Sequence, residues 1–361
     1  MVVEIKDNDL YFVGGVVRDE ILGTPSFDTD FCYEGNAIEF SKKFNVIKTN
    51  PDFGTVRITY EGKEIDIAST RTETYPLSGH LPVVSNIGCA LKEDLSRRDF
   101  SINAMAKNTV TNEIIDFFNG QDDIKNKLIR VLHNKSFIDD PSRILRALKF
   151  SIRFNFELEK ETKKLQDEYL ANINYDMSYH RLKKELKETF NLNKEEALEK
   201  FINQNIYKLL GKNQTLPKIN TSIKDLVDKY KPDCIWLVYI GMFNLDNFEL
   251  TNEEKNILTS YEKIKNKIPN TDIDIYNLFI EVPLEATLLY AITVNKDIAI
   301  KYLDNLSKTK ISLTGNVLLE LGIQQGKIYR EIFNYVLEKK LQEPDTSSED
   351  EINWVKEKFL W

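Results

Sequence analysis

Cysteine and histidine are scarce in this chain. The 361 residues contain three of each, no two cysteines have Cys-x-x-Cys spacing, and the histidines are not clustered. An odd number of cysteines without paired spacing argues against a disulfide scaffold and against a thiolate zinc site. Isolated histidines likewise argue against a metal centre built on imidazoles. Any metal ion in this protein must therefore be held by carboxylates.

Long apolar runs and an excess of positive charge are also missing. The longest strongly apolar stretch, residues 234–243, has about half of the roughly 20 residues needed to cross a bilayer. The first residues lack the basic and apolar regions of a signal peptide. We therefore expect a cytoplasmic protein without a membrane partner. Because the formal net charge is -8, a nucleic-acid partner would need a local basic patch.

The chain divides into two regions of different composition. Up to about residue 132, short β-branched or aromatic runs alternate with turn signals, and nine of the 14 glycines lie there. From about Phe137 onward, the pattern is that of helices rich in Leu, Lys and Glu. We predict an α+β protein with a mixed-sheet head (1–132), a helical neck (133–192) and a helical body and tail (193–361).

A glycine turn near the start of the chain is the first motif with chemical content. Residues 10–23, LYFVGGVVRDEILG, predict a strand, a turn at Gly14 and Gly15, and a helix. The free N–H groups and the dipole of such a helix start favour a phosphate, and Arg18 could add a fork of donors. The alternative is a plain tight turn with a surface arginine.

A pair of carboxylates follows in the segment FDTDF, residues 27–31. In a strand, Asp28 and Asp30 point to the same face, and two such carboxylates repel each other unless a divalent cation lies between them. Hard oxygen ligands select Mg²⁺, and Asp66, in the expected strand 64–68, could be a third acid. The alternative is a solvated polar face on an edge strand.

The segment LSRRDFSINAMA, residues 95–106, places charges beside an apolar run. Adjacent Arg97 and Arg98 in this context indicate that at least one arginine points inward toward a partner. Asn103 needs a hydrogen-bond partner if it is buried. The alternative is the charged N-terminus of a helix.

The segment DDPSRILRALKFSIRF, residues 139–154, predicts a helix that starts at Pro141. At 100° per residue, one face of that helix is basic, and Leu145, Leu148 and Ile152 lie opposite. The basic face consists of Arg143, Arg146, Lys149 and Arg153. The alternative is an amphipathic helix with a solvated face and Asp140 as its N-cap.

These four motifs occur together in the order and approximate spacing of one family. With GGVVRD, DTD, RRDFSINAMA and DDPSRILRALKF, the sequence resembles the class II tRNA nucleotidyltransferases. These are the CCA-adding enzymes and their poly(A) polymerase relatives, within the polymerase-β-like nucleotidyltransferase superfamily. The resemblance covers roughly residues 10–190. It implies template-independent addition of CCA, from CTP and ATP, to the acceptor end of tRNA by two-metal nucleotidyl transfer with Mg²⁺, and tRNA binding by the helical region after residue 192.

The resemblance also implies a role for each motif residue. The implied triphosphate ligands are Gly14, Gly15 and Arg18, and the implied ligands of the catalytic magnesium ions are Asp28 and Asp30. The implied nucleotide pocket comprises Arg98, Asp99 and Asn103. The implied readers of the base edge are Asp140 and Arg143, supported by Arg146, and Lys149 is a further implied nucleotide-binding residue. The family usually has arginine at Lys149, glutamate at Asp139 and an acidic residue at His180, so this chain departs from its pattern there.

Several alternatives stay open at this point. Within the family they are A-only addition, CC-only addition and poly(A) synthesis. Residues 73–87 resemble the full-length flexible loop that CC-only relatives lack, and because they show no sustained periodicity we expect this loop to be mobile. Outside the family, an inactive RNA-binding protein on the same fold is disfavoured by the intact Asp28 and Asp30. A dinucleotide-binding oxidoreductase would need GxGxxG after the first strand, which GGVVRD does not supply.

Overall fold

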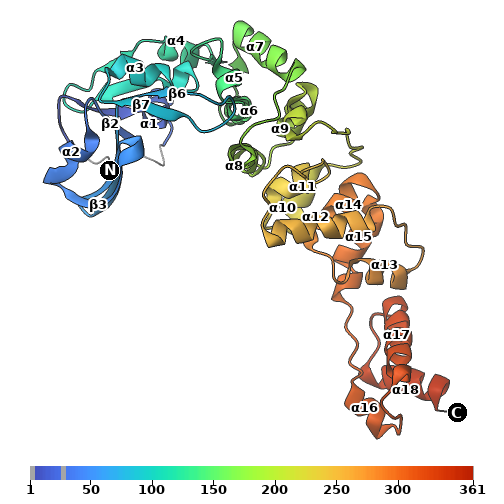
Figure 1. The fold of residues 1–361 in the computed structure, drawn as a ribbon. Helices are drawn as coiled ribbons and strands as arrows, with labels where there is room; N and C mark the ends of the chain where they lie inside the picture. Colours follow the sequence, from blue (N-terminus) through green and yellow to red (C-terminus); the bar gives the residue numbers. More distant parts are fainter. Residues whose placement is uncertain (1–4, 26–29, 361) are drawn as a thin grey trace. The chain divides into compact units, whose positions relative to one another are not determined.

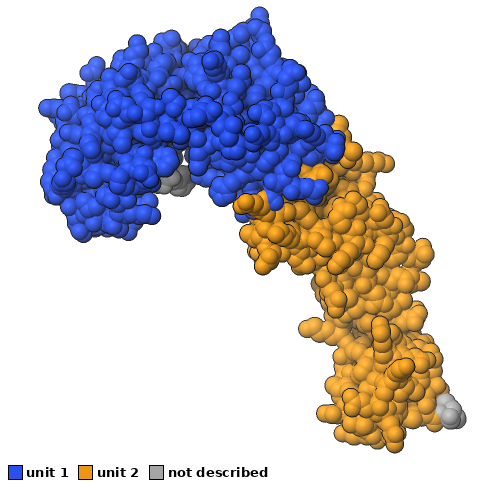
Figure 2. All heavy atoms as spheres, in the orientation of Figure 1, with its two compact units in different colours: residues 1–214, 246–248 blue, residues 215–245, 249–361 orange. Residues whose placement is uncertain are grey.

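The structure is a computed structural model that describes residues 5–25 and 30–360 (Figure 1). The chain forms two compact units. The first unit comprises residues 1–214 with 246–248, and the second comprises residues 215–245 with 249–361 (Figure 2). The predicted α+β class is confirmed, because a mixed sheet at the start of the chain is followed by helices. The division of the chain at residues 132 and 192 stays a prediction.

A seven-stranded sheet in the order β3-β4-β5-β2-β1-β8-β9 forms the first part of the first unit. Strands β2 and β5 pair in parallel, and the other neighbours pair antiparallel. The strands are β1 (Leu10–Val13), β2 (Asp30–Tyr33), β3 (Asn45–Asn50), β4 (Thr55–Tyr60), β5 (Lys63–Ser69), β8 (Met105–Asn108) and β9 (Ile114–Asp116). Because β2 lies between β5 and β1, it is an interior strand, and the edge-strand alternative for its carboxylates is wrong.

Alternation along the strands separates two apolar cores. Leu10 and Phe31 belong to a core that includes Ala37 of α2 (Ala37–Phe40). The next residues along, Tyr11 and Cys32, belong to a core with Leu91 of α3 (Leu91–Ser96). Successive side chains in a strand point to opposite faces, so both faces of the sheet are covered.

Residues 73–87 contain part of a β-hairpin, in which β6 (Arg71–Thr74) pairs antiparallel with β7 (Val83–Ile87). Residues 73–87 are therefore not a loop throughout, and the mobility expected of them stays a prediction. Its tip is held by backbone hydrogen bonds: Gly79 N–H donates to Asp139 O (3.0 Å), and Ser178 N–H donates to Gly79 O (2.9 Å). The tip therefore packs against the segments that precede α6 and α8.

The rest of the first unit is largely helical. Its remaining elements are α1 (Gly15–Leu22), α4 (Gly120–Lys125), β10 (Leu128–Ile129), α5 (Ser136–Asp139), α6 (Ser142–Phe154), β11 (Glu157–Leu158), α7 (Lys160–Ala171), α8 (Tyr179–Phe190) and α9 (Glu195–Asn203). The short 3₁₀ segments of this unit are η1 (Ser41–Lys43), η2 (Pro51–Phe53), η3 (Ser101–Asn103) and η4 (Ile206–Leu210). Helices α6 and α8 pack against each other, and their facing side chains form one wall of the site described below.

The second unit is helical over its described residues. Its helices are α10 (Ile223–Tyr230), α11 (Ile235–Ile240), α12 (Asn252–Ile264), α13 (Asp272–Phe279), α14 (Leu284–Thr293), α15 (Lys296–Asp304), η5 (Leu306–Lys308), α16 (Gly315–Glu320), α17 (Lys327–Gln342) and α18 (Ser348–Phe359). The apolar stretch 234–243 forms α11, whose residues Trp236 to Ile240 are buried against α14. None of the helices among the described residues combines the length and apolar character that a membrane span requires.

Candidate active site

A cavity of about 560 Å³ in the first unit collects most of the predicted site residues. It is lined by Gly14, Gly15, Arg18, Asp30, Arg98, Asp99, Asn103, Asp140, Arg143 and Arg146, together with residues of the hairpin and of α8. Asp66 and Lys149 lie outside its lining. Asp28 falls outside the described residues.

The glycine turn has the predicted form, a strand that ends at Val13 and a helix that begins at Gly15. Gly14 has a φ of 71°, a conformation that residues with a side chain rarely adopt. A Cβ at this position would lie 3.1 Å from Arg98 Nη1. The turn therefore lets the backbone and the Arg98 guanidinium approach each other at the start of α1.

Arg18 is buried, with 4% of its surface exposed, so the surface-arginine alternative is wrong. Its Nε and Nη2 donate to Asp19 Oδ1 (2.8 and 2.6 Å), and its Nη1 donates to Asn103 Oδ1 (2.6 Å). Burial lowers the pKa of Arg18, and the hydrogen bond and charge of Asp19 oppose that effect. These contacts fix the guanidinium against Asn103 at the cavity wall.

Asn103 and Asp99 continue this network. The Asn103 amide donates to Asp99 Oδ1 (3.0 Å), which supplies the partner that a buried asparagine needs. Asp99 also accepts from Arg146 Nε (2.8 Å). Burial by itself would raise the pKa of Asp99, but the Arg146 charge and the hydrogen bonds from Asn103 and Arg146 lower it to about 2. Asp99 is therefore held as a carboxylate.

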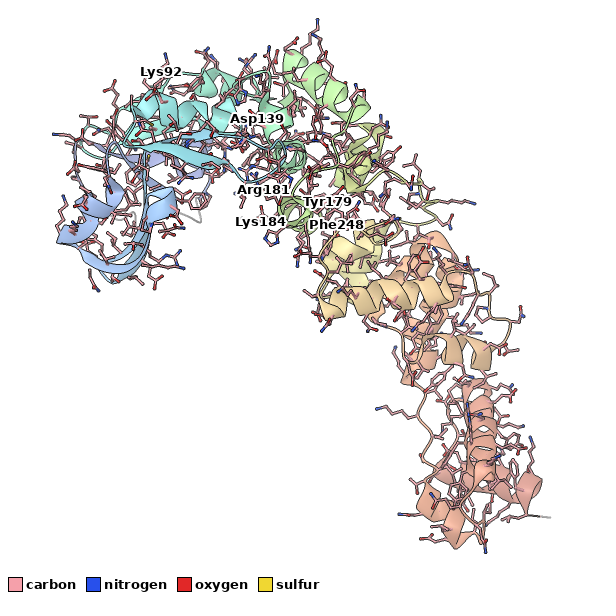
Figure 3. All side chains as sticks on the ribbon, viewed as in Figure 1. Lys92, Asp139, Tyr179, Arg181, Lys184 and Phe248 are labelled. Atoms are coloured by element: carbon pink, nitrogen blue, oxygen red, sulfur yellow. The ribbon has the colours of Figure 1, made fainter. Side chains whose placement is uncertain are left out.

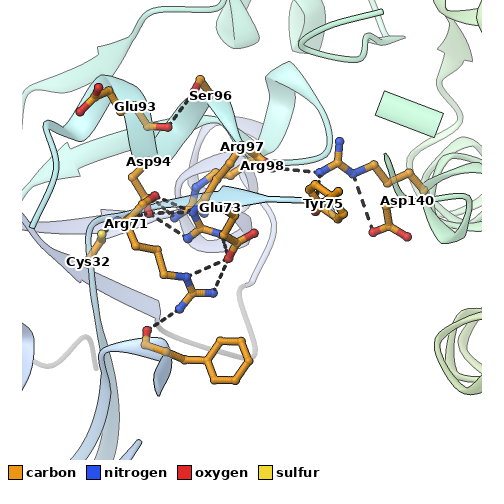
Figure 4. Close-up of polar contacts among 12 residues, drawn as sticks. Cys32, Arg71, Glu73, Tyr75, Glu93, Asp94, Ser96, Arg97, Arg98 and Asp140 are labelled. Atoms are coloured by element: carbon orange, nitrogen blue, oxygen red, sulfur yellow. Dashed lines mark hydrogen bonds and ion pairs between the residues drawn. The ribbon is translucent and has the colours of Figure 1, made fainter. Parts of the chain in front are cut away.

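Both adjacent arginines of the third motif point inward, as the sequence predicts for at least one of them (Figure 4). Arg97 Nη2 lies 2.8 Å and Arg98 Nη2 lies 3.1 Å from the carboxylate of Asp94, which is fully buried. Arg97 also contacts Glu73 of β6 (2.9 Å), and Arg71 contacts the same glutamate (2.8 Å). This network ties the base of the hairpin to α3.

The fourth motif forms α6, which begins at Ser142, one residue later than predicted. Asp140 Oδ1 accepts from Ser142 N (3.1 Å), and its Oδ2 faces Arg143 Nε (3.8 Å) and Arg181 of α8. Arg143 donates to Ser136 Oγ (2.6 Å) and to Arg97 O (2.9 Å). The N-cap of α6 is Pro141, so the alternative in which Asp140 is the N-cap is wrong, and Asp140 lies at the cavity.

The basic face of α6 is buried or half-buried at Arg143, Arg146 and Lys149, so the solvated-face alternative is wrong for these three residues, whereas Arg153 is exposed. Arg143 and Lys149 are 3% and 8% exposed. Glu185 of α8 accepts from Arg146 Nη1 (3.1 Å) and from Lys149 Nζ (2.6 Å), and Lys149 also pairs with Glu188. Lys149 thereby joins α6 to α8, and its assignment to the nucleotide stays a prediction.

Sequence reasoning did not name the individual residues that α8 and the hairpin contribute to the cavity. The cavity lining includes Arg181, Lys184 and Glu185 of α8, and Arg71, Glu73 and Tyr75 of the hairpin; Arg181 and Lys184 are labelled in Figure 3. The spacing of Arg181 and Glu185 by four residues places them on one helix face. This spacing is a signal that could have found them.

The parallel pairing of β2 and β5 brings two acidic residues to neighbouring positions. Asp30 and Asp66 are register partners and lie next to each other on one sheet face. Carboxylate oxygens in this arrangement fit a hard divalent cation. Asp66 is also engaged by Arg57, whose Nε and Nη2 donate to its two oxygens (2.8 and 2.7 Å). Among the described residues, no group of three or more His, Cys, Asp or Glu side chains is placed to hold a metal ion.

Comparison with known proteins places the chain in a family. The model of the poly(A) polymerase head domain matches residues 10–130. An A-adding tRNA nucleotidyltransferase of Halalkalibacterium halodurans is 30% identical over 393 residues, which cover 99% of this chain and 90% of that relative. The chain belongs to the class II tRNA nucleotidyltransferase family. The resemblance seen in the four motifs is thereby confirmed.

Other class II tRNA nucleotidyltransferases match with different coverage. An A-adding enzyme of Aquifex aeolicus is 48% identical over 163 residues, 43% of this chain, and the match spans only 20% of that relative's length. A CCA-adding enzyme of Ligilactobacillus salivarius is 29% identical over 362 residues, 92% of this chain and 88% of the relative. Relatives named for both specificities are therefore similar to this chain.

Solved structures of CCA-adding enzymes share the fold over nearly the whole chain. A CCA-adding enzyme in an apo form has a TM-score of 0.78 at 28% identity, with 96% of this chain and 91% of that chain covered. A CCA-adding enzyme in complex with ATP has a TM-score of 0.74 at 27% identity (98% and 91%). The Thermotoga maritima CCA-adding enzyme in complex with tRNA has a TM-score of 0.72 at 27% identity (96% and 90%).

Proposed function

We propose that this protein adds CCA to the 3′ end of tRNA from CTP and ATP by Mg²⁺-assisted nucleotidyl transfer. The observation that carries the proposal is that Asp140 and Arg143 line the same cavity as the Gly14–Gly15 turn and Asp30. One cavity thus combines groups suited to a base edge, a polyphosphate and a reacting phosphate. The relatives named for A addition and CCA addition, and the structures with ATP and with tRNA, support this type of reaction.

The cavity is suited to a polyphosphate because cationic side chains surround it. They are Arg18, Arg71, Arg97, Arg98, Arg143, Arg146, Arg181 and Lys184. The start of α1 at Gly15 adds backbone N–H groups and the positive end of a helix dipole. We assign the triphosphate to Gly14, Gly15 and Arg98, with Arg18 holding Asn103 in position beside them.

Asp140 and Arg143 are suited to the base edges of cytosine and adenine. Each of these bases presents an amino group next to a ring nitrogen that accepts a hydrogen bond, whereas uracil and guanine present a ring N–H next to a carbonyl. A carboxylate accepts from the amino group, and a guanidinium donates to the ring nitrogen. The Asp–Arg pair therefore favours CTP and ATP without a nucleic-acid template.

The acidic residues of the second motif are assigned to the reaction centre. Asp30, with Asp28 from the same motif, would hold Mg²⁺, and Asp66 is the third candidate acid. When bound there, Mg²⁺ would lower the pKa of the attacking 3′-hydroxyl and neutralise charge on the departing pyrophosphate. The protein's own contribution is to hold the nucleotide at the cavity wall, so that its α-phosphate stays beside Asp30.

A-only addition is the second candidate. It is favoured by the relative that aligns over 99% of this chain, which is named as an A-adding enzyme. The proposed base readers do not separate the two specificities, because they accept both cytosine and adenine. In either case, we propose that the helices after residue 192 bind parts of the tRNA other than its acceptor end.

One incorporation assay tests both candidates. The protein is incubated with tRNAs that lack the whole CCA end, or that end after the first or the second C, with CTP and ATP singly and together, and the 3′ ends are sequenced. CCA addition predicts complete ends on all three tRNAs. Addition of A only after the second C would select the A-adding function. The absence of incorporation on every tRNA would overturn the proposal, and Asp30→Asn serves as the inactive control.

A further inference from the structure

A second cavity, of about 510 Å³, adjoins the first one at the reaction centre. The two share Asp30, Arg71, Arg97 and Arg98 as lining residues. The remaining wall of the second cavity comes mainly from β3, β4 and β5 and includes Lys48, Asn50, Arg57 and Asp66. A nucleotidyl transfer joins two substrates. If the nucleotide binds in the first cavity, the second cavity is available to the strand that is extended.

The lining charges of the second cavity suit a polyanion. Its cations are Lys48, Arg57, Arg71, Arg97 and Arg98, and its carboxylates are Asp30 and Asp66. Thr49, Asn50 and Thr55 add uncharged polar groups. A cationic groove with polar side chains, open at a pair of carboxylates, matches a phosphodiester strand whose terminal hydroxyl reaches those carboxylates.

Three neighbouring strands, β4, β5 and β2, each place one charged residue in the same register row: Arg57, Asp66 and Asp30. Arg57 of β4 is the register partner of Asp66, and Asp66 is the register partner of Asp30. Arg57 engages both oxygens of Asp66, while the two side chains remain 47% and 56% exposed. Glu64 is the other acid near this guanidinium, at 3.7 Å. Such a solvated ion pair adds little stability, and a phosphate offers the guanidinium an equally good bidentate partner.

We infer that Arg57 is a positioning residue that exchanges Asp66 for a phosphate of the acceptor strand. In the free protein the guanidinium occupies both oxygens of Asp66. When the RNA enters the second cavity, Arg57 binds its phosphate, and Asp66 turns both oxygens toward the space beside Asp30. Binding of the strand thereby completes the acidic site where the terminal hydroxyl has to react. This inference rests on the proposed nucleotidyl transfer to RNA.

RNA binding measured without nucleotides tests the exchange directly. Arg57→Ala is compared with wild type and with Lys42→Ala, which also removes an exposed cation from an ion pair but lines neither cavity. We expect Arg57→Ala to weaken binding of a tRNA lacking CCA by about five- to tenfold. The slope of log K against log salt should fall by about one. Lys42→Ala should change neither quantity. Arg57→Lys, which keeps the charge but loses the fork, should bind with intermediate affinity and keep the wild-type salt slope.

Turnover separates this inference from the proposed function. Arg57→Ala should raise the KM for tRNA and leave the KM for the nucleotide unchanged. If wild type extends tRNA and Arg57→Ala keeps the wild-type affinity and salt slope, the inference is refuted while the proposed function stands. A faster turnover of Arg57→Ala with unchanged tRNA affinity would also refute it, because Arg57 would then only mask Asp66. If wild type extends no tRNA, the proposed function itself fails.

Discussion

The network around Asp99 allows a stability prediction that can be worked out from its pKa. Asp99 is held as a carboxylate by Arg146 and Asn103, with a pKa of about 2. The pKa of an aspartate in the unfolded chain is about 3.9. A lowered pKa stabilises the folded state above the unfolded value, and the contribution is lost as the pH falls through the folded value. At pH 7 the difference corresponds to about 2.5 kcal/mol.

Asp99→Asn removes this charge and keeps the shape of the side chain. We expect the variant to lose about 2.5 kcal/mol of unfolding free energy at pH 7 and roughly half of that at pH 3, where the wild-type advantage has begun to disappear. Urea titrations of both proteins at the two pH values measure the difference. The first unit's own transition has to be followed, because a chain with two compact units need not unfold in one step.

A loss below about 0.5 kcal/mol at pH 7, or a loss that is equal at pH 7 and pH 3, would refute the reasoning. The matched control is Asp176→Asn, because the exposed side chain of Asp176 forms an ion pair with the partly exposed His80. Its substitution should change the unfolding free energy by no more than about 0.5 kcal/mol. In the nucleotide reaction, Asp99→Asn should raise the KM for CTP and ATP, because Arg146 and Asn103 lose the group that orients them.

Three further predictions concern the reaction. Asp30→Asn should abolish incorporation and leave the thermal midpoint and tRNA affinity nearly unchanged; normal Mg²⁺-dependent turnover would remove Asp30 from the reaction centre. Asp140→Ala should increase misincorporation of UTP and GTP, through the loss of about 1–3 kcal/mol of discrimination, as sequenced 3′ ends would reveal. A lower thermal midpoint with unchanged nucleotide preference would leave Asp140 with a structural role alone, through its hydrogen bond to Ser142. Replacing residues 76–85 by two glycines should leave any C addition active and strongly reduce A addition, and an equal loss of both would indicate a structural role for the hairpin.

The sequence was sufficient to predict the structure where all the residues that determine it lie in one short segment. The glycine turn is an example, because the strand, the positive φ of Gly14 and the helix start are set by neighbouring residues. The need of Asn103 for a partner also followed from its apolar surroundings. Together with the order of the motifs, these features were enough to predict the fold class and the family.

Contacts between segments that are distant in the sequence could not be predicted from these local patterns. The basic face of α6 has the spacing of a solvated helix face, and only Glu185 and Glu188, on another helix, turn Lys149 inward. Likewise, the pairing of Arg57 with Asp66 depends on the register between β4 and β5. The hairpin strands β6 and β7 have four and five residues, which is too few for a periodic sequence signal. These strands are ordered by pairing with each other, which the sequence pattern of either segment does not show.

The tip of the hairpin is attached through the main chain, which makes its attachment measurable by amide hydrogen exchange. The hydrogen bonds join Gly79 to the carbonyl of Asp139 and the amide of Ser178, so they do not depend on which side chains the tip carries. The constraint at this point is steric, because a Cβ on residue 79 would lie 2.8 Å from Met177 Cβ. Protection of the Gly79 and Ser178 amides therefore reports docking directly. Their exchange rates, compared with and without nucleotide, would show whether the tip lifts when a nucleotide binds, with no substitution or attached probe in the protein.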